Sequence, residues 1–189
     1  LIGGAPLIGA SAGYLLGTDI SLNGAGTILA VGAPMTGTNH GKVYLYNISS
    51  SSVTLSSSPG ISMNGSPVTG TFDINVINAN TGVSVSLNQA GTKLAIGSNG
   101  VNTNQGTVHI IDINSDVMTL NSVIIPPTNF IETSPGNLTQ YYGFGTRVRL
   151  NDDGTALAIS RLSMACQDEP YNTVHPPVMT NGYVALYKD

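Results

Sequence analysis

The sequence predicts an all-β fold built from one unit that repeats every 63 to 65 residues. The motif Leu-Asn-x-x-Gly-Thr occurs three times, with its glycine at Gly26, Gly91 and Gly154. Around each copy, apolar and polar residues alternate with a period of two, which is typical of half-buried strands. No segment shows a sustained helical period bounded by capping residues. A long fixed period indicates one supersecondary unit used several times in succession.

Each unit is expected to open with a short strand that ends at the Leu of the motif. Ile or Val and Leu occupy one face of this strand, and polar residues occupy the other. Such alternation with β-branched residues predicts a strand with one buried face. The three strands are expected at 18–22, 83–87 and 147–150.

The motif itself predicts a tight turn followed by a second strand. The Asn side chain caps the turn, and the glycine supplies the positive φ of a type I turn followed by a bulge. The next strand is a nearly continuous apolar run with a small Ala at its centre, which predicts that neighbouring sheets approach closely there. These second strands are expected at 28–31, 94–96 and 156–159.

Third and fourth strands complete a four-stranded antiparallel meander. The third strands follow a glycine and are expected at 41–46, 106–111 and 182–187, and weaker fourth strands at 52–56 and 117–125. Four-stranded units at a fixed period are typical of the blades of a β-propeller. The chain is expected to be a single domain, 1–189, with units near 1–13 (partial), 14–80, 81–142 and 143–189.

The number of units also predicts how a propeller would close. About three and a half units are recognisable, whereas propellers have about four to eight blades. We therefore expect either a fragment of a longer polypeptide or a protomer that closes its ring by association. Unpaired terminal units expose sheet edges and apolar faces, which favours association.

Composition excludes some functions and favours a location. Only 8% of the residues are charged, the net charge is −4, and the six Lys and Arg form no cluster, so no nucleic acid is expected as a partner. No apolar run is long enough for membrane insertion.

The single Cys166 excludes a disulfide within the chain. Low charge and abundant Ser, Thr and Asn favour an extracellular location, on a cell or virion surface; acceptor patterns for N-glycosylation occur at Asn47, Asn64 and Asn137.

Two further motifs resemble the FG-GAP repeat, the blade of integrin-α-like β-propellers. Phe144-Gly145 carries the Phe-Gly early in the blade, and Gly32-Ala33-Pro34 carries the Gly-Ala-Pro after the second strand. The other copies of the two motifs are degenerate: Leu16-Gly17 and Thr81-Gly82 for the first, Gly97-Ser98 and Ser160-Arg161 for the second. In every repeat the glycine of the first motif lies 15 residues before the first residue of the second motif. The resemblance implies a propeller of four-stranded blades.

The resemblance also implies a place for calcium, which many FG-GAP blades bind in an Asp-rich loop between the first two strands. Here the loop is shorter, and its first two copies have no carboxylate at the equivalent positions. The third copy offers only Asn151 and Asp153 as weak candidates, beside Arg149. Because a hard cation needs several carboxylate oxygens, no metal or other cofactor is expected, as in a calcium-free variant of the family.

In integrin-like propellers, ligands bind at the face formed by the loops between strands two and three and between blades. Carried over, these loops are 34–40, 61–81, 98–105, 126–142 and 161–181, which differ between the repeats. Variable loops on a constant frame are where binding usually resides. The candidate ligand or partner residues on them are Asn39, His40, Asn102, Asn104, Tyr141, Tyr142, Asp168, Glu169, Tyr171 and His175.

No catalytic residue can be assigned from the sequence. It contains no Gly-x-Ser-x-Gly elbow, no His-Glu-x-x-His and no P-loop. We therefore expect a non-enzymatic binding or structural protein that mediates adhesion or assembly with a protein partner or with itself. Two alternatives stay open: a lectin-like glycan binder that stacks sugar on Tyr141 and Tyr142, and a hydrolase or lyase that uses Asp168 or His175.

Overall fold

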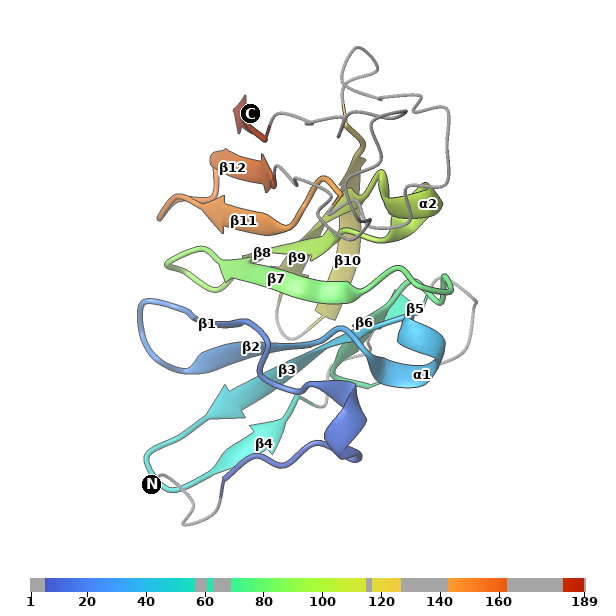
Figure 1. Cartoon of the computed structure of the whole chain (residues 1–189). Coiled ribbons are helices and arrows are strands. Elements are labelled where there is room, and N and C mark those ends of the chain that lie inside the picture. Colours follow the sequence, from blue (N-terminus) through green and yellow to red (C-terminus); the bar gives the residue numbers. More distant parts are fainter. Residues whose placement is uncertain are drawn as a thin grey trace, which may run out of the picture.

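A computed structural model describes residues 6–56, 61–62, 69–114, 117–126, 143–162 and 182–188. These residues form three β-sheets that are mainly antiparallel and that lie one on another in chain order (Figure 1). The all-β fold predicted from the sequence is confirmed. The described part of the chain does not close into a barrel or a ring.

The first sheet contains the predicted meander and two additional strands. β1 (Ile20–Leu22), β2 (Ile28–Ala33), β3 (Lys42–Ile48) and β4 (Val53–Leu55) pair in succession, all antiparallel. β4 covers only the end of β3, so β6 (Thr71–Asp73) pairs with the beginning of the same strand. β5 (Ile61–Ser62) then pairs with β6 in parallel. The sequence did not predict β5 and β6, which lie in the segment 61–81 that was expected to be a loop.

The second and third sheets repeat the same order. The second is a complete four-stranded meander, and three strands of the third are described. Their strands are β7 (Thr81–Leu87), β8 (Lys93–Ser98), β9 (Thr107–Asn114) and β10 (Val117–Ile124), then β11 (Arg147–Leu150), β12 (Ala156–Arg161) and β13 (Tyr183–Lys188). In all three sheets the first strand lies at an edge.

In the part of the chain that the structure describes, three single helical turns lie outside the sheets: η1 (Ala12–Tyr14), α1 (Thr36–Asn39) and α2 (Val101–Asn104). α1 and α2 each stand between the second and third strand of their sheet, where the sequence predicted only polar loops. Helices of four residues are too short to show a period of 3.6. Among the described residues, no helix is both long and apolar enough to cross a membrane.

The three turns of the repeated motif adopt the predicted conformation. The Oδ1 atom of Asn23 accepts hydrogen bonds from the amides of Thr27 and Ile28, at 2.8 and 3.0 Å. Asn88 makes the same pair of bonds to the equivalent amides, and Asn151 makes the second of them. The glycines of the motif have φ between 67° and 76°, a region that glycine enters without steric cost.

Two apolar layers hold the sheets together. The first lies between sheets one and two and the second between sheets two and three. Ala30 and Ala95, the small residues at the centre of β2 and β8, are fully buried in these layers. Residues paired across the strands share a face, so each sheet has a leading face toward the preceding sheet and a trailing face toward the following one.

Candidate binding face and the joints that position it

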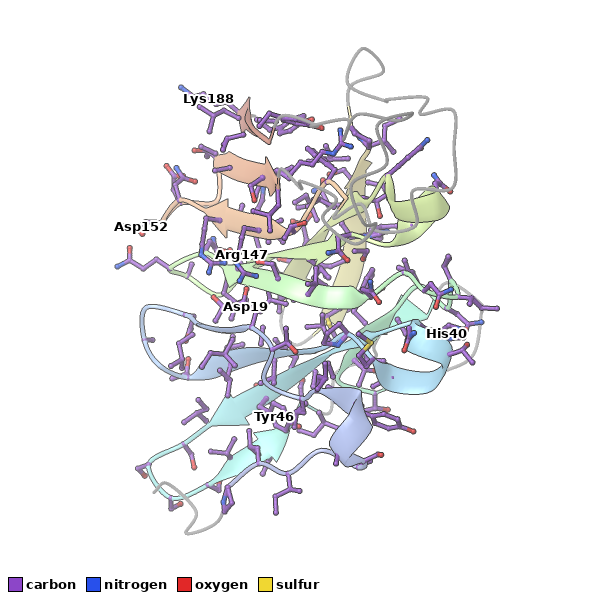
Figure 2. All side chains as sticks on the ribbon, viewed as in Figure 1. Asp19, His40, Tyr46, Arg147, Asp152 and Lys188 are labelled. Carbon is purple, nitrogen blue, oxygen red and sulfur yellow. The ribbon has the colours of Figure 1, made fainter. Side chains whose placement is uncertain are left out.

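Neighbouring sheets are joined at three levels, and each joint occurs twice at equivalent residues. The first level lies at the turns of the repeated motif. The amide of Gly24 donates to the carbonyl of Gln89 at 2.8 Å, and the amide of Gln89 donates to the carbonyl of Asp152 at 2.9 Å. The three residues occupy the same position in their repeats. The turns of the three sheets are therefore linked in series along one side of the molecule, which Figure 2 marks with Asp152.

The second level joins the first strands of the sheets. Oδ2 of Asp19 and Oγ of Ser21 accept hydrogen bonds from the amides of Val85 and Leu87, at 3.0 and 2.9 Å. One sheet further, Ser84 and Ser86 accept from the amides of Val148 and Leu150, at 3.1 and 2.9 Å. An edge strand leaves every second amide without a partner in its own sheet. Side chains of the preceding sheet satisfy these amides.

Close backbone contact accompanies this joint. A Cβ placed on Gly32 would lie 1.9 Å from the carbonyl oxygen of Gly82, and a Cβ on Gly97 would lie 1.9 Å from that of Gly145. No side chain fits at either position, so the second strand of one sheet touches the first strand of the next. The third sheet has Ser160 at the equivalent position.

The third level fixes the two short helices. The carbonyl of His40, directly after α1, accepts from the amide of Thr81 at 3.0 Å. The carbonyl of Gln105, directly after α2, accepts from the amide of Phe144 at 2.8 Å. Because the same joint recurs one sheet later, α1 and α2 lie on the same side of the molecule, opposite the linked turns (Figure 1).

Six residues on this side form what we call the asparagine face: Asn39, His40, Asn78, Asn80, Asn99 and Asn102. Nδ2 of Asn39 donates to Oδ1 of Asn78 at 3.3 Å, and the amide of Asn80 donates to the carbonyl of Asn39 at 3.0 Å. Nδ2 of Asn80, the residue before β7, donates to Oδ1 of Asn99 at 3.2 Å, which connects the start of the second sheet to the loop before α2. The face is therefore continuous from α1 to α2.

The backbone of this region depends on asparagine. Asn39, Asn78, Asn80 and Asn102 have φ between 51° and 59°, the left-handed region that Asn tolerates better than most residues. Asn39, Asn78 and Asn102 are exposed, whereas Asn99 is buried. The exposed amides can both donate and accept hydrogen bonds, and they carry no charge. Such a surface suits a neutral ligand with hydroxyl or amide groups.

The structure places some of the predicted ligand residues and leaves others outside its description. Asn39, His40 and Asn102 belong to the asparagine face, and Asn104 ends α2. Figure 2 shows His40 beside α1, where its Nε2 lies 2.8 Å from Oγ1 of Thr38. The remaining predicted residues lie outside the described residues: Tyr141, Tyr142, Asp168, Glu169, Tyr171 and His175. The sequence-based candidates did not include Asn78, Asn80 and Asn99, although three asparagines within residues 75–80 could have indicated a polar binding surface.

The two weak metal candidates are used by the third turn. Oδ1 of Asn151 accepts from the amide of Ala156 at 2.8 Å. Oδ1 of Asp153 accepts from the hydroxyl and the amide of Thr155, at 2.6 and 2.9 Å, and these bonds lower the pKa of the exposed Asp153 carboxyl. No group of three or more His, Cys, Asp or Glu side chains within metal-binding reach occurs among the described residues. Both side chains therefore have a role in shaping the turn.

A charged cluster that the sequence did not predict lies where the three first strands meet. Nη1 of Arg149 lies 3.3 Å from Oδ2 of Asp19 and 3.4 Å from Oγ of Ser84, and the Ser84 hydroxyl donates to Oδ2 of Asp19 at 2.7 Å. The three side chains come from three different sheets. Because Ser84 is fully buried and bonded to the amide of Val148, it is not a candidate nucleophile. The cluster therefore joins the first strands of the three sheets.

His109 is buried between the first two sheets and lies away from the asparagine face. Its ring packs on Phe72, with the ring centroids 5.2 Å apart. Burial lowers the pKa of His109 to about 4, so the side chain is neutral at pH 7. A neutral, inaccessible imidazole can fill space between sheets but cannot exchange protons with a substrate.

Comparison of the chain with known protein families and with characterised proteins gave no match.

Proposed function

We propose that this chain is a non-enzymatic recognition module of a cell or virion surface, with its three sheets as consecutive blades of an FG-GAP-like β-propeller. The repeated joints support the propeller arrangement. Because each sheet contacts the next through equivalent residues at three levels, each step from sheet to sheet uses nearly the same rotation. A constant rotation between four-stranded antiparallel units is what a propeller requires.

The proposed binding site is the asparagine face, and its composition carries the proposal. The segments 35–40, 74–80 and 99–105 contain no Asp, Glu, Lys or Arg. Two apolar side chains, Val76 and Ile77, are exposed between its asparagines, and Ile77 is 64% exposed. An apolar centre, surrounding amides and few charges are typical of the core of a protein–protein interface. We infer that the partner is a protein, in adhesion or in assembly.

Binding of labelled chain to surfaces coated with extracellular matrix proteins, and to a glycan array, tests the proposal. Ile77→Asp should weaken protein binding by at least about tenfold, since it places a charge in the apolar centre. Ile125→Asp is the matched control, because Ile125 is 61% exposed and lies outside the asparagine face. Protein binding that both variants retain would contradict the site.

Glycan binding is the second candidate, favoured by the exposed amides of Asn39 and Asn78, which match sugar hydroxyls. Signal on the glycan array alone, lost in Asn78→Ala, would support it over a protein partner. The hydrolase or lyase alternative ranks below both, since the sequence has no motif of a nucleophile with its base. An absence of any binding, together with turnover of a substrate, would refute the non-enzymatic proposal.

A further inference from the structure

Both outer faces of the three-sheet stack carry exposed apolar residues whose equivalents between two sheets are buried or, at Leu150, partly buried. On the leading face of the first sheet, Ile20 and Leu22 are 59% and 54% exposed. Their equivalents in the second sheet, Val85 and Leu87, are buried against the first sheet. Val148, the equivalent of Ile20 in the third sheet, is also fully buried.

The trailing face of the third sheet shows the same contrast. Val184 and Leu186 of β13 are 66% and 80% exposed. At the equivalent positions, Val43 and Leu45 of the first sheet are buried between sheets one and two. Val108 and Ile110 of the second sheet are likewise buried, between sheets two and three. These outer-face residues thus have the character of an inner face, and no further sheet packs on them within the described residues.

We propose that these two outer faces bind each other, so that the third sheet of one copy of this chain packs on the first sheet of a second copy. The evidence for this occupant is internal, because leading and trailing faces of this composition already pack together twice in the structure. The contact is heterologous, since two different surfaces meet. It does not depend on the ligand proposed for the asparagine face.

Charge supports the same pairing. In the first inner joint, Asp19 contacts the equivalent residue of the next sheet, Ser84, through a 2.7 Å hydrogen bond. The third sheet has the exposed Arg147 at this position. By the same geometry, Arg147 of one copy would face Asp19 of the second copy. Asp19 already forms an ion pair with Arg149 of its own chain, and Arg147, whose guanidinium has donors beyond its bond to the Thr146 carbonyl, would be a second cation near this carboxylate.

Two residues make the contact between copies wider than the inner ones. Ser160 stands where Gly32 and Gly97 allow backbone contact, so the second copy stays further away at that end. Arg147 replaces the smaller acceptors Asp19 and Ser84 of the inner faces. The additional width accommodates this long side chain. We therefore expect association that is reversible, in contrast to the permanent packing within one chain.

Two copies provide six sheets, which lies within the range of four to eight blades that propellers use. The stoichiometry of two therefore rests on the propeller proposed above, whereas the contact itself does not. Light scattering during gel filtration should give a particle of twice the 19.4 kDa mass of one chain. A wild-type chain that stays monomeric over the whole range of concentrations would overturn the proposal.

Three substitutions identify the faces. Ile20→Lys and Leu186→Lys should each yield a monomer, because each places an ammonium group in the contact. Ile125→Lys, at a residue as exposed as Ile20 but on neither outer face, should leave the dimer intact. Circular dichroism should show the same β-rich spectrum for all three, since the substituted side chains are exposed. A dimer that survives either Ile20→Lys or Leu186→Lys would contradict the pairing.

Mixing the two monomeric variants tests the heterologous geometry directly. The mixture contains one intact trailing face, on the Ile20→Lys copy, and one intact leading face, on the Leu186→Lys copy. We expect a dimer to reappear, at higher concentration than for the wild type because only one of two contacts is intact. A mixture that stays monomeric would overturn the head-to-tail contact. If the wild-type chain forms particles larger than a dimer that grow with concentration, and each substitution abolishes them, the contact is supported and the closed ring is refuted.

Discussion

Gly97→Ala should destabilise the protein by separating the second sheet from the third. The added Cβ would lie 1.9 Å from the carbonyl oxygen of Gly145 and 3.0 Å from its carbonyl carbon. Both atoms belong to the backbone, so no side-chain rotation relieves the contact. The two strands must therefore move apart by more than 1 Å at this point, since Cβ contacts below 3.0 Å essentially never occur.

Two opposing effects set the size of the loss. Forcing an additional carbon into a packed layer costs about 1–3 kcal/mol. Replacing Gly by Ala at a position without a positive φ restricts the unfolded chain and returns about 0.4–1 kcal/mol. The separation also loosens the apolar layer that contains Val108, Val148 and Ile159. We expect a net decrease of about 2 kcal/mol in the free energy of unfolding.

Urea unfolding followed by circular dichroism measures this change. Gly13→Ala is the matched control, because a Cβ at Gly13 meets no atom within 4 Å and its φ is not positive. The control should unfold at the wild-type midpoint or slightly above it. If Gly97→Ala is as stable as Gly13→Ala, the two sheets are not in backbone contact and the reasoning is refuted.

Two further predictions concern buried polar groups. Ser84→Ala should lower the free energy of unfolding by about 1–3 kcal/mol, because the amide of Val148 loses its acceptor and a carboxylate oxygen of Asp19 loses one of its three donors. Ser122→Ala is the control and should change nothing, since Ser122 is exposed. Urea unfolding compares the two variants, and equal stability would contradict the joint. His109 should make the protein less stable in acid. Its pKa is lowered from 6.5 to about 4 in the folded state, so the unfolded state binds a proton at higher pH than the folded state does. The free energy of unfolding should therefore be highest above pH 6.5 and decrease by about 3 kcal/mol as the pH falls to 4. His109→Leu should remove this slope between pH 6.5 and 4, and an unchanged slope would show that another group causes it.

Local chemistry made the turns and strands predictable from the sequence. The hydrogen bonds of the capping Asn23 and of the left-handed Gly26 that shape the turn all join residues no more than five apart, so the motif alone determines the turn. The meander followed from alternation in the same way. β5 and β6 could not be predicted, because β6 depends on pairing with the free half of β3 and β5 depends on pairing with β6.

The joints and most of the asparagine face depend on the placement of one sheet against the next. Ser84 and Ser86 are polar residues on a strand face, which the sequence alone cannot distinguish from a solvent-exposed face. Their partners, Val148 and Leu150, are 64 residues away. The same holds for Asn39 and Asn80, which meet through the bond from the Asn80 amide to the Asn39 carbonyl only because the first and second sheets are in contact.

Hydrogen exchange at the edge amides tests the repeated joints most directly. The amides of Val85, Leu87, Val148 and Leu150 face away from their own sheets and bond only to side chains of the preceding sheet. Measured residue by residue by NMR, all four should exchange slowly, and Ser86→Ala should accelerate exchange at Leu150 more than at Leu87. Fast exchange at these four amides in the wild-type protein would show that the sheets are not joined, and the account of the fold and of the asparagine face would fail with it.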